Sequence, residues 1–200
     1  MPVTARQLVG REEELAAILQ LLDAPAHLPA AAVLTGEAGI GKTTVWLAGL
    51  DAAAARGYRI LSSRPSEAEA QSSYLGLTDL LADAAGDVMS ELPPIQRRAL
   101  EVALLLGDSE AHADERVVGA AFLGALRLLA AEAPVCLAVD DIQWLDAASL
   151  AAVRHVLARL DHEPVAALLA VRGDVPEWVR RAIPEDRVGT VEVGGLSVGA

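Results

Sequence analysis

The sequence predicts an α/β protein in which helices cover both faces of a parallel β-sheet. Two observations lead to this prediction. Short apolar runs, typical of buried strands, alternate along the chain with longer segments whose apolar residues recur at the period of an amphipathic helix. Hydrophobic residues make up 53% of the 200 residues, which excludes a disordered chain and is enough to form a sizeable core.

The first expected elements are a helix and a strand–helix–strand unit. In residues 12–22 the apolar side chains have the spacing i, i+3, i+4 and i+7, and three glutamates in the first turn suit the positive end of a helix. Residues 23–29 contain two prolines and are expected to form a loop. The next elements are a strand over 31–35, a helix over 42–56 and a strand over 58–62.

The middle of the chain, residues 63–133, has no strand pattern, so we expect a helical insertion between the second and third strands. Its helices are expected around residues 77–84, over 94–106 after two prolines, and over 116–131. After the insertion the alternation resumes. The elements expected there are strands over 135–139, 165–171 and 188–193 and helices over 149–160 and 177–182.

Charge and composition exclude several classes of protein. The net charge of −12 argues against nucleic-acid binding by this segment and against docking on an anionic membrane. A single cysteine excludes an internal disulfide framework. No apolar stretch reaches about 18 residues and the N-terminus does not resemble a signal peptide, so we expect a cytoplasmic protein without a membrane span.

A phosphate-binding motif follows the first expected strand and opens the next helix. Residues 36–43 read GEAGIGKT and match G-x-x-x-x-G-K-[ST]. The glycines let successive backbone N–H groups point at phosphate oxygens, and the helix N-terminus adds partial positive charge. Lys42, the only lysine among 16 basic residues, is expected to reach the β- and γ-phosphates, and Thr43 to bind Mg²⁺. The residues assigned to nucleotide binding here are Gly36, Glu37, Ala38, Gly39, Ile40, Gly41, Lys42, Thr43 and Thr44.

An acidic pair, Asp140 and Asp141, follows the third expected strand. We expect Asp140 to hold Mg²⁺ together with Thr43, and Asp141 to orient or deprotonate the attacking water. Arg172 directly follows the fourth strand, and parallel strands present their carboxyl ends to the same ligand crevice. Arg172 is therefore expected to sense the γ-phosphate, which makes Asp141 and Arg172 the predicted catalytic residues.

Four segments together resemble a known family. Residues 8–15 (LVGREEEL), 36–44, 140–149 (DDIQWLDAAS) and 170–172 are similar to the AAA-type module of signal-transduction (STAND) ATPases, above all to that of large ATP-binding LuxR-type transcriptional regulators. The module is also similar to origin-recognition AAA ATPases. The resemblance implies a P-loop NTPase fold with a five-stranded sheet of order 5-1-4-3-2, and ATP as the ligand. It also implies that Val9, Gly10 and Arg11 lie against the adenine and ribose.

The resemblance covers nearly the whole chain, so we expect residues 1–200 to form one ATP-binding core. The full-length regulators continue with a helical lid and a C-terminal helix-turn-helix, and neither is found in this sequence. DNA binding is therefore expected from a domain outside this segment. The parts of the core are an N-terminal segment (1–30), the P-loop unit (31–62), the helical segment (63–133) and the part from the acidic strand to the last strand (134–200).

The favoured function is a nucleotide switch that binds ATP and ADP and is at most a weak ATPase, with self-association through the module as an option. One alternative is a small-molecule P-loop kinase, in which a substrate hydroxyl replaces water. Such kinases carry a lid with several arginines, whereas Arg97, Arg98, Arg154 and Arg159 are scattered over expected helices. Another alternative is a nucleotide-binding interaction module without turnover.

Overall fold

The computed structural model describes residues 10–23, 29–106 and 114–195. Their five strands form one sheet of order β2-β3-β4-β1-β5, and every neighbouring pair is parallel. Read from the other edge, this is the predicted order 5-1-4-3-2, so the predicted fold class is confirmed. The strands are β1 (Ala30–Thr35), β2 (Arg59–Ser63), β3 (Val135–Val139), β4 (Val165–Ala170) and β5 (Val188–Glu192).

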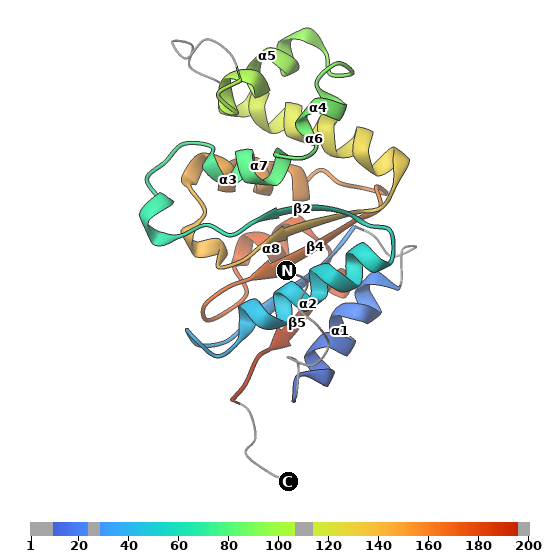
Figure 1. The fold of residues 1–200 in the computed structure, drawn as a ribbon, viewed down its shortest axis with the longest axis vertical. Coiled ribbons are helices and arrows are strands. Elements are labelled where there is room, and N and C mark those ends of the chain that lie inside the picture. Colours follow the sequence, from blue (N-terminus) through green and yellow to red (C-terminus); the bar gives the residue numbers. More distant parts are fainter. Residues whose placement is uncertain (1–9, 24–28, 107–113, 196–200) are drawn as a thin grey trace.

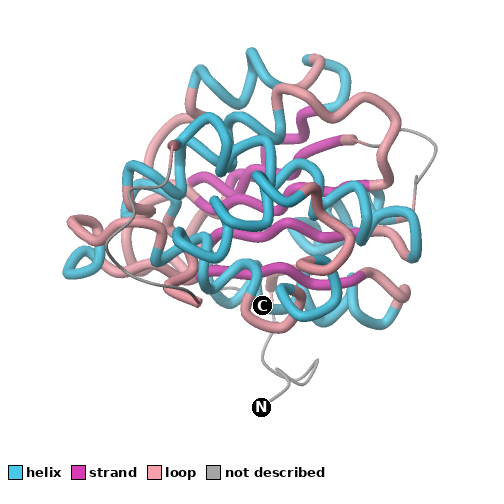
Figure 2. Tube along the Cα trace, turned by 90° about the horizontal axis from the view of Figure 1, so that it is seen from above, coloured by secondary structure: helices cyan, strands magenta, loops and turns pink. Residues whose placement is uncertain are grey.

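Helices cover both faces of this sheet (Figure 1). Seen from above, the strands lie side by side with helices around them (Figure 2). The helices are α1 (Glu12–Leu22), α2 (Lys42–Ala55), α3 (Leu75–Leu81), α4 (Ala85–Val88), α5 (Pro94–Ala103), α6 (Glu115–Glu132), α7 (Ala147–Leu157) and α8 (Glu177–Ala182), with short 3₁₀ turns η3 (Glu67–Glu69), η4 (Ile142–Trp144) and η5 (Glu185–Arg187).

Alternate residues of each central strand enter two separate cores. In β3, Val135, Leu137 and Val139 pack under α3, α6, α7 and α8, whereas Cys136 and Ala138 pack under α1 and α2. All five residues of β3 are buried, as expected for a parallel strand covered on both faces. The continuous apolar runs in the sequence follow from this double burial.

The predicted helical insertion between β2 and β3 is present as η3 and α3 to α6. In Figure 1, α5 and α6 form an outer layer beyond α3 and α7. The boundaries differ from the expected ones for local reasons. The helix expected around residues 77–84 is α3, which ends at Leu81, and α4 begins only at Ala85, after the expected end. Helix α5 ends at Ala103 because Leu105 adopts a positive φ of 56°. No helix in the described ranges is both long enough and apolar enough to cross a membrane.

Candidate functional site

The glycine-rich loop joins the carboxyl end of β1 to α2. Gly36, Gly39 and Gly41 have φ angles of 144°, 75° and 106°, in the range that glycine tolerates and other residues rarely adopt. A side chain at Gly36 would place its Cβ 2.6 Å from the carbonyl oxygen of Val193. An isolated antiparallel bridge also pairs Gly36 with Gly173, which lies three residues beyond the end of β4. The loop therefore has the curled backbone that a phosphate cradle requires.

Lys42 is almost fully buried at the start of α2. Its Nζ donates hydrogen bonds to the carbonyl oxygens of Gly36, at 3.0 Å, and Glu37, at 2.8 Å. The loop thus holds an ammonium group over its own concave side, where an anion would bind. Lys42 and Thr43 line a cavity of about 210 Å³ together with Ala38, Gly39, Gly41, Asp141 and Arg172.

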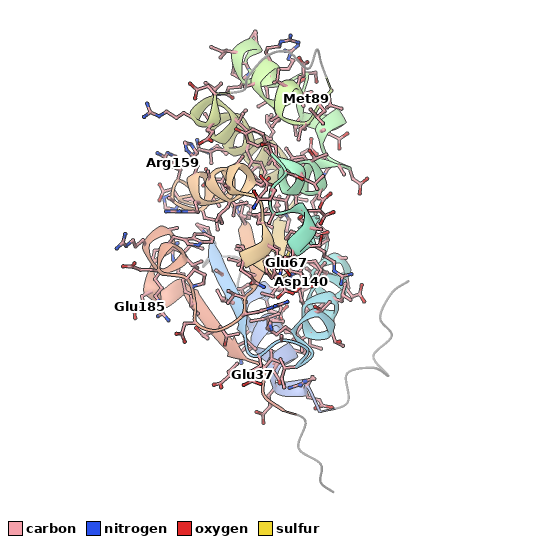
Figure 3. The ribbon with its side chains drawn as sticks, turned by 90° about the vertical axis from the view of Figure 1, so that its left-hand side faces the viewer. Glu37, Glu67, Met89, Asp140, Arg159 and Glu185 are labelled. Carbon is pink, nitrogen blue, oxygen red and sulfur yellow. The ribbon has the colours of Figure 1, made fainter. Side chains whose placement is uncertain are left out.

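Asp140 directly follows β3 and is 5% exposed. Its Oδ2 accepts a hydrogen bond from Thr43 Oγ1 at 2.8 Å and lies 3.5 Å from Arg64 Nε. Burial raises the pKa of Asp140, and the hydrogen bond from Thr43 opposes this effect. Asp140 Oδ1 is buried and has no hydrogen-bond partner among the described residues. Figure 3 shows Asp140 between the helical layer above and Glu37 of the phosphate loop below.

A hydroxyl oxygen beside a carboxylate with one unpartnered oxygen fits a magnesium ion. Hard oxygen ligands are those that Mg²⁺ prefers, and the ion keeps several waters when one or two side chains bind it. Thr43 and Asp140 are therefore the described residues that would hold the cation with the phosphates. That they bind Mg²⁺, as predicted from the sequence, stays a prediction.

The two predicted catalytic residues lie together. Asp141 has a positive φ of 48°, and its Oδ2 lies 3.6 Å from Nη2 of Arg172. Gln143 Nε2 donates to the other carboxylate oxygen of Asp141 at 3.0 Å. The Arg172 guanidinium also lies over the ring of Trp144, 5.5 Å from its centroid. Asp141 and Arg172 therefore form one charge pair at the wall of the phosphate cavity.

Of the segment expected to lie against adenine, Val9 is outside the described residues. Arg11 is 7% exposed and donates to the carbonyl oxygen of Ile40 in the phosphate loop at 2.8 Å. Its other nitrogen pairs with Glu14 at 2.8 Å. Gly10 and Arg11 line a groove of about 520 Å³ between α1 and β5. Arg11 thus braces the loop, and its predicted contact with the nucleoside stays a prediction.

Asp146 is the N-cap residue of α7. Its side chain accepts from the backbone N–H of Ser149 at 2.9 Å and so caps α7. The same carboxylate accepts from the N–H groups of Tyr74 and Gly76, at 2.9 and 3.0 Å, at the start of α3. One side chain therefore fixes two helices that are distant in sequence.

Two residues at the site were not found from the sequence. Gln143 bonds Asp141, and Arg64 pairs with Asp140. A signal for Arg64 was available, because this arginine directly follows β2, much as Arg172 follows β4 in the same sheet. The argument that identified Arg172, applied to every strand, would have identified Arg64. No comparable pattern identifies Gln143.

The fold and the site together define a P-loop nucleotide-binding protein: a parallel α/β sheet, a glycine-rich loop with lysine and threonine opening a helix, and an acidic pair at the carboxyl end of another strand of the sheet. The family model described as "AAA ATPase domain" matches residues 7–169. The chain therefore belongs to the AAA ATPase domain family. No curated protein matches the chain in sequence.

Several solved structures resemble the chain at low identity. Cdc6p from Pyrobaculum aerophilum is 15% identical, with a TM-score of 0.57 over 92% of this chain and 45% of that one. PCH-2 from C. elegans is 13% identical (TM-score 0.46, 92% and 43%), and a katanin structure is 17% identical (TM-score 0.47, 96% and 54%). The similarity to Cdc6p supports the AAA fold, and the chain spans about half the length of these structures.

Proposed function

We propose that this chain is the ATP-dependent switch module of a signal-transduction ATPase, of the kind found in large LuxR-type transcriptional regulators, and that it hydrolyses ATP slowly. The observation that carries the proposal is the single cavity in which the glycine-rich loop, Lys42, Asp141 and Arg172 meet. Two cationic side chains, loop N–H groups and a water-positioning acid around one cavity suit the binding and hydrolysis of a phosphate chain.

The residues divide the work as follows. The loop and Lys42 bind the β- and γ-phosphates, and Lys42 exchanges its two carbonyl partners for phosphate oxygens. Thr43 and Asp140 would hold Mg²⁺, which would neutralise charge on the phosphates. Arg172 contacts the γ-phosphate, because it lines the same cavity as the loop. Asp141 accepts a hydrogen bond from the attacking water.

Slow turnover is supported by the contacts of Asp141. One carboxylate oxygen faces Arg172 at 3.6 Å, and the other accepts from Gln143 at 3.0 Å. Both contacts compete with the attacking water for the lone pairs of the carboxylate. An arginine supplied by another subunit or domain can contribute about 10³–10⁵ in rate, so this segment alone is expected to turn over weakly.

The alternative of a small-molecule kinase receives less support. Four arginines that a kinase could use to clamp phosphates have other partners. Arg97 donates to two backbone carbonyls, and Arg154 lies over the ring of Trp178 at 6.0 Å. Figure 3 shows Arg159 well apart from Asp140. The remaining arginine, Arg98, pairs with Glu101.

The regulatory context is the part of the proposal furthest from the site. It rests on the resemblance of residues 8–15 and 140–149 to LuxR-type regulators. The net charge of −12 argues against DNA binding by this segment itself. Self-association is a further proposal, and sedimentation of the chain with and without ATP would test it.

Replacing Lys42 with alanine tests nucleotide binding. Loss of a charged partner in a partly buried site should weaken ATP binding by about 100-fold, measured by isothermal titration calorimetry. Arg98→Ala removes the same charge from an exposed face of α5 and should bind ATP like the wild type. An ATP affinity of Lys42→Ala equal to that of the wild type would contradict the proposal.

Replacing Asp141 with asparagine tests hydrolysis. The variant should bind ATP with nearly wild-type affinity, because Lys42 and the loop are intact, and release phosphate about 100-fold more slowly. Phosphate release in single-turnover assays is the measurement. Equal rates in both proteins would exclude Asp141 as the water-positioning acid. A wild type that binds ATP without turnover would favour the interaction module.

A further inference from the structure

Arg64 contacts the metal-binding carboxylate, and no step of the proposed function uses it. Its Nε lies 3.5 Å from Asp140 Oδ2, and the two side chains are 57% and 7% exposed. Within the described part of the chain, the guanidinium makes no other polar contact, so its terminal N–H groups face solvent. Asp140 is thus a buried carboxylate, and its partner Arg64 is an exposed side chain that can move away from it.

The register between β2 and β3 brings Arg64 and Asp140 next to each other. Strands β2 and β3 pair in parallel with Ser63 opposite Val139, and the N–H of Asp140 donates to the carbonyl of Ser63 at 3.1 Å. Arg64 and Asp140 are therefore the next residues beyond the ends of two hydrogen-bonded strands. Pro65 restricts Arg64 to an extended backbone. The contact thus follows from the fold as well as from the side-chain rotamer.

The two groups on Asp140 Oδ2 differ in their effect on a metal. Thr43 donates its proton to this oxygen and keeps two lone pairs that could bind a metal. Arg64 brings a positive charge to the same oxygen. A divalent cation binds less tightly while the guanidinium stays, because the two positive charges repel each other.

We propose that Arg64 is a stand-in cation: it neutralises Asp140 in the metal-free protein and is displaced when a divalent cation binds. This inference rests on the proposed function in one respect, the role of Asp140 in holding the metal. Arg64 weakens the affinity of the empty site for a free cation. The displaced guanidinium can donate to phosphate oxygens, so it favours nucleotide.

The consequence is coupling between metal and nucleotide. A nucleotide that draws Arg64 away frees Asp140 for the metal, and by linkage the metal strengthens nucleotide binding by the same factor. Arg64 therefore makes the site selective for the metal–nucleotide complex over the free metal ion.

The test measures Mn²⁺ binding to the full chain by electron paramagnetic resonance, without nucleotide. Arg64→Gln should bind Mn²⁺ about fivefold more tightly than the wild type, the upper end of the range for a solvent-accessible ion pair. Arg64→Lys keeps the charge and should stay near the wild type. Arg59→Gln is the matched control, because it removes an arginine from the other end of β2, where Asp87 and Glu132 are its partners.

The second experiment measures ADP binding without metal. Here the substitution of Arg64 is expected to weaken binding instead of tightening it. Arg64→Gln should bind metal-free ADP about fivefold more weakly, because a cation beside the phosphates is lost. Equal Mn²⁺ affinity in Arg64→Gln and the wild type, or equal tightening by Arg59→Gln, would overturn the inference. A wild type that binds no nucleotide would instead defeat the proposed function, and the Mn²⁺ arm would still decide the role of Arg64.

Discussion

At the scale of single residues, the phosphate loop depends on backbone conformations that only glycine adopts easily. Gly36 combines a φ of 144° with a close approach to the carbonyl oxygen of Val193. Gly57, which follows α2, has a φ of 80° but nothing within 4 Å of where its Cβ would be. The two positions therefore separate the effect of backbone conformation from that of steric contact.

Substitution of these glycines should give different losses of stability. Gly57→Ala should lower the free energy of unfolding by about 1 kcal/mol, because only the left-handed conformation is penalised. Gly36→Ala should lower it by about 3 kcal/mol, because the methyl group also meets backbone that cannot move away cheaply. Urea denaturation of both variants is the measurement. Equal losses would mean that the contact with Val193 is relieved by a small shift.

Residues in a contiguous motif were predictable, whereas residues brought in by strand register were not all found. Lys42 and Thr43 follow from one string of eight residues. The pairing of Thr43 with Asp140, 97 residues apart, follows from the general rule that carboxyl ends of parallel strands share an edge. The contact between Gln143 and Asp141 depends on side-chain geometry after a left-handed residue, which no periodicity encodes.

At the scale of elements, Asp146 ties the helical insertion to the segment that follows the acidic pair. It is 2% exposed and accepts hydrogen bonds from both α3 and α7. Asp114 caps α6 in the ordinary way, with its side chain accepting from two N–H groups of its own helix. Each aspartate is the N-cap of its own helix, but of the two only Asp146 also accepts hydrogen bonds from a second helix.

Removing these caps should therefore have unequal effects. Asp114→Ala should lower the free energy of unfolding by about 1 kcal/mol, the usual value for an N-cap. Asp146→Ala should lower it by about 3 kcal/mol, because it leaves buried N–H groups of two helices without acceptors. Thermal and urea unfolding would measure both. A loss near 1 kcal/mol for Asp146→Ala would mean that water replaces the carboxylate at α3.

At the scale of the whole molecule, the sheet and its two cores were predictable because apolar runs alternate with helical segments both before and after the helical insertion. The order of the strands was not contained in that alternation and came from the family resemblance. The helical insertion was predicted as a region, but its internal breaks were not. Leu105, for example, ends α5 through a positive φ that a leucine rarely adopts.

Stability in acid is a property of the whole molecule to which Glu163 contributes. Burial alone would raise the pKa of Glu163, but hydrogen bonds from the backbone N–H of Asp161 and the side chain of Arg127 lower it to about 2. Because the folded-state pKa lies below the ordinary 4.5, this stabilisation is complete above pH 4.5 and is lost as the pH falls towards about 2.

Glu163→Gln should therefore lower stability at pH 7 by about 1 kcal/mol and reduce the dependence of the unfolding free energy on pH between about 4.5 and 2. Urea denaturation at several pH values is the measurement. Glu177→Gln, which alters an exposed pair with Arg181, should leave both quantities nearly unchanged. A Glu163→Gln curve parallel to the wild-type curve would show that other carboxylates govern the acid range.

The position of β1 in the sheet has a consequence for the order in which the protein is made. Of the five strands that the structure describes, β1 is synthesised first, whereas its two neighbours, β4 and β5, are synthesised last and begin at residues 165 and 188. Until they leave the ribosome, the apolar strand before the phosphate loop has no partner on either side. Contacts between residues so distant in sequence form slowly, and until they form the unpaired edges of the strand stay exposed. The nucleotide site, although encoded near the N-terminus, is therefore completed among the last parts of the molecule to fold.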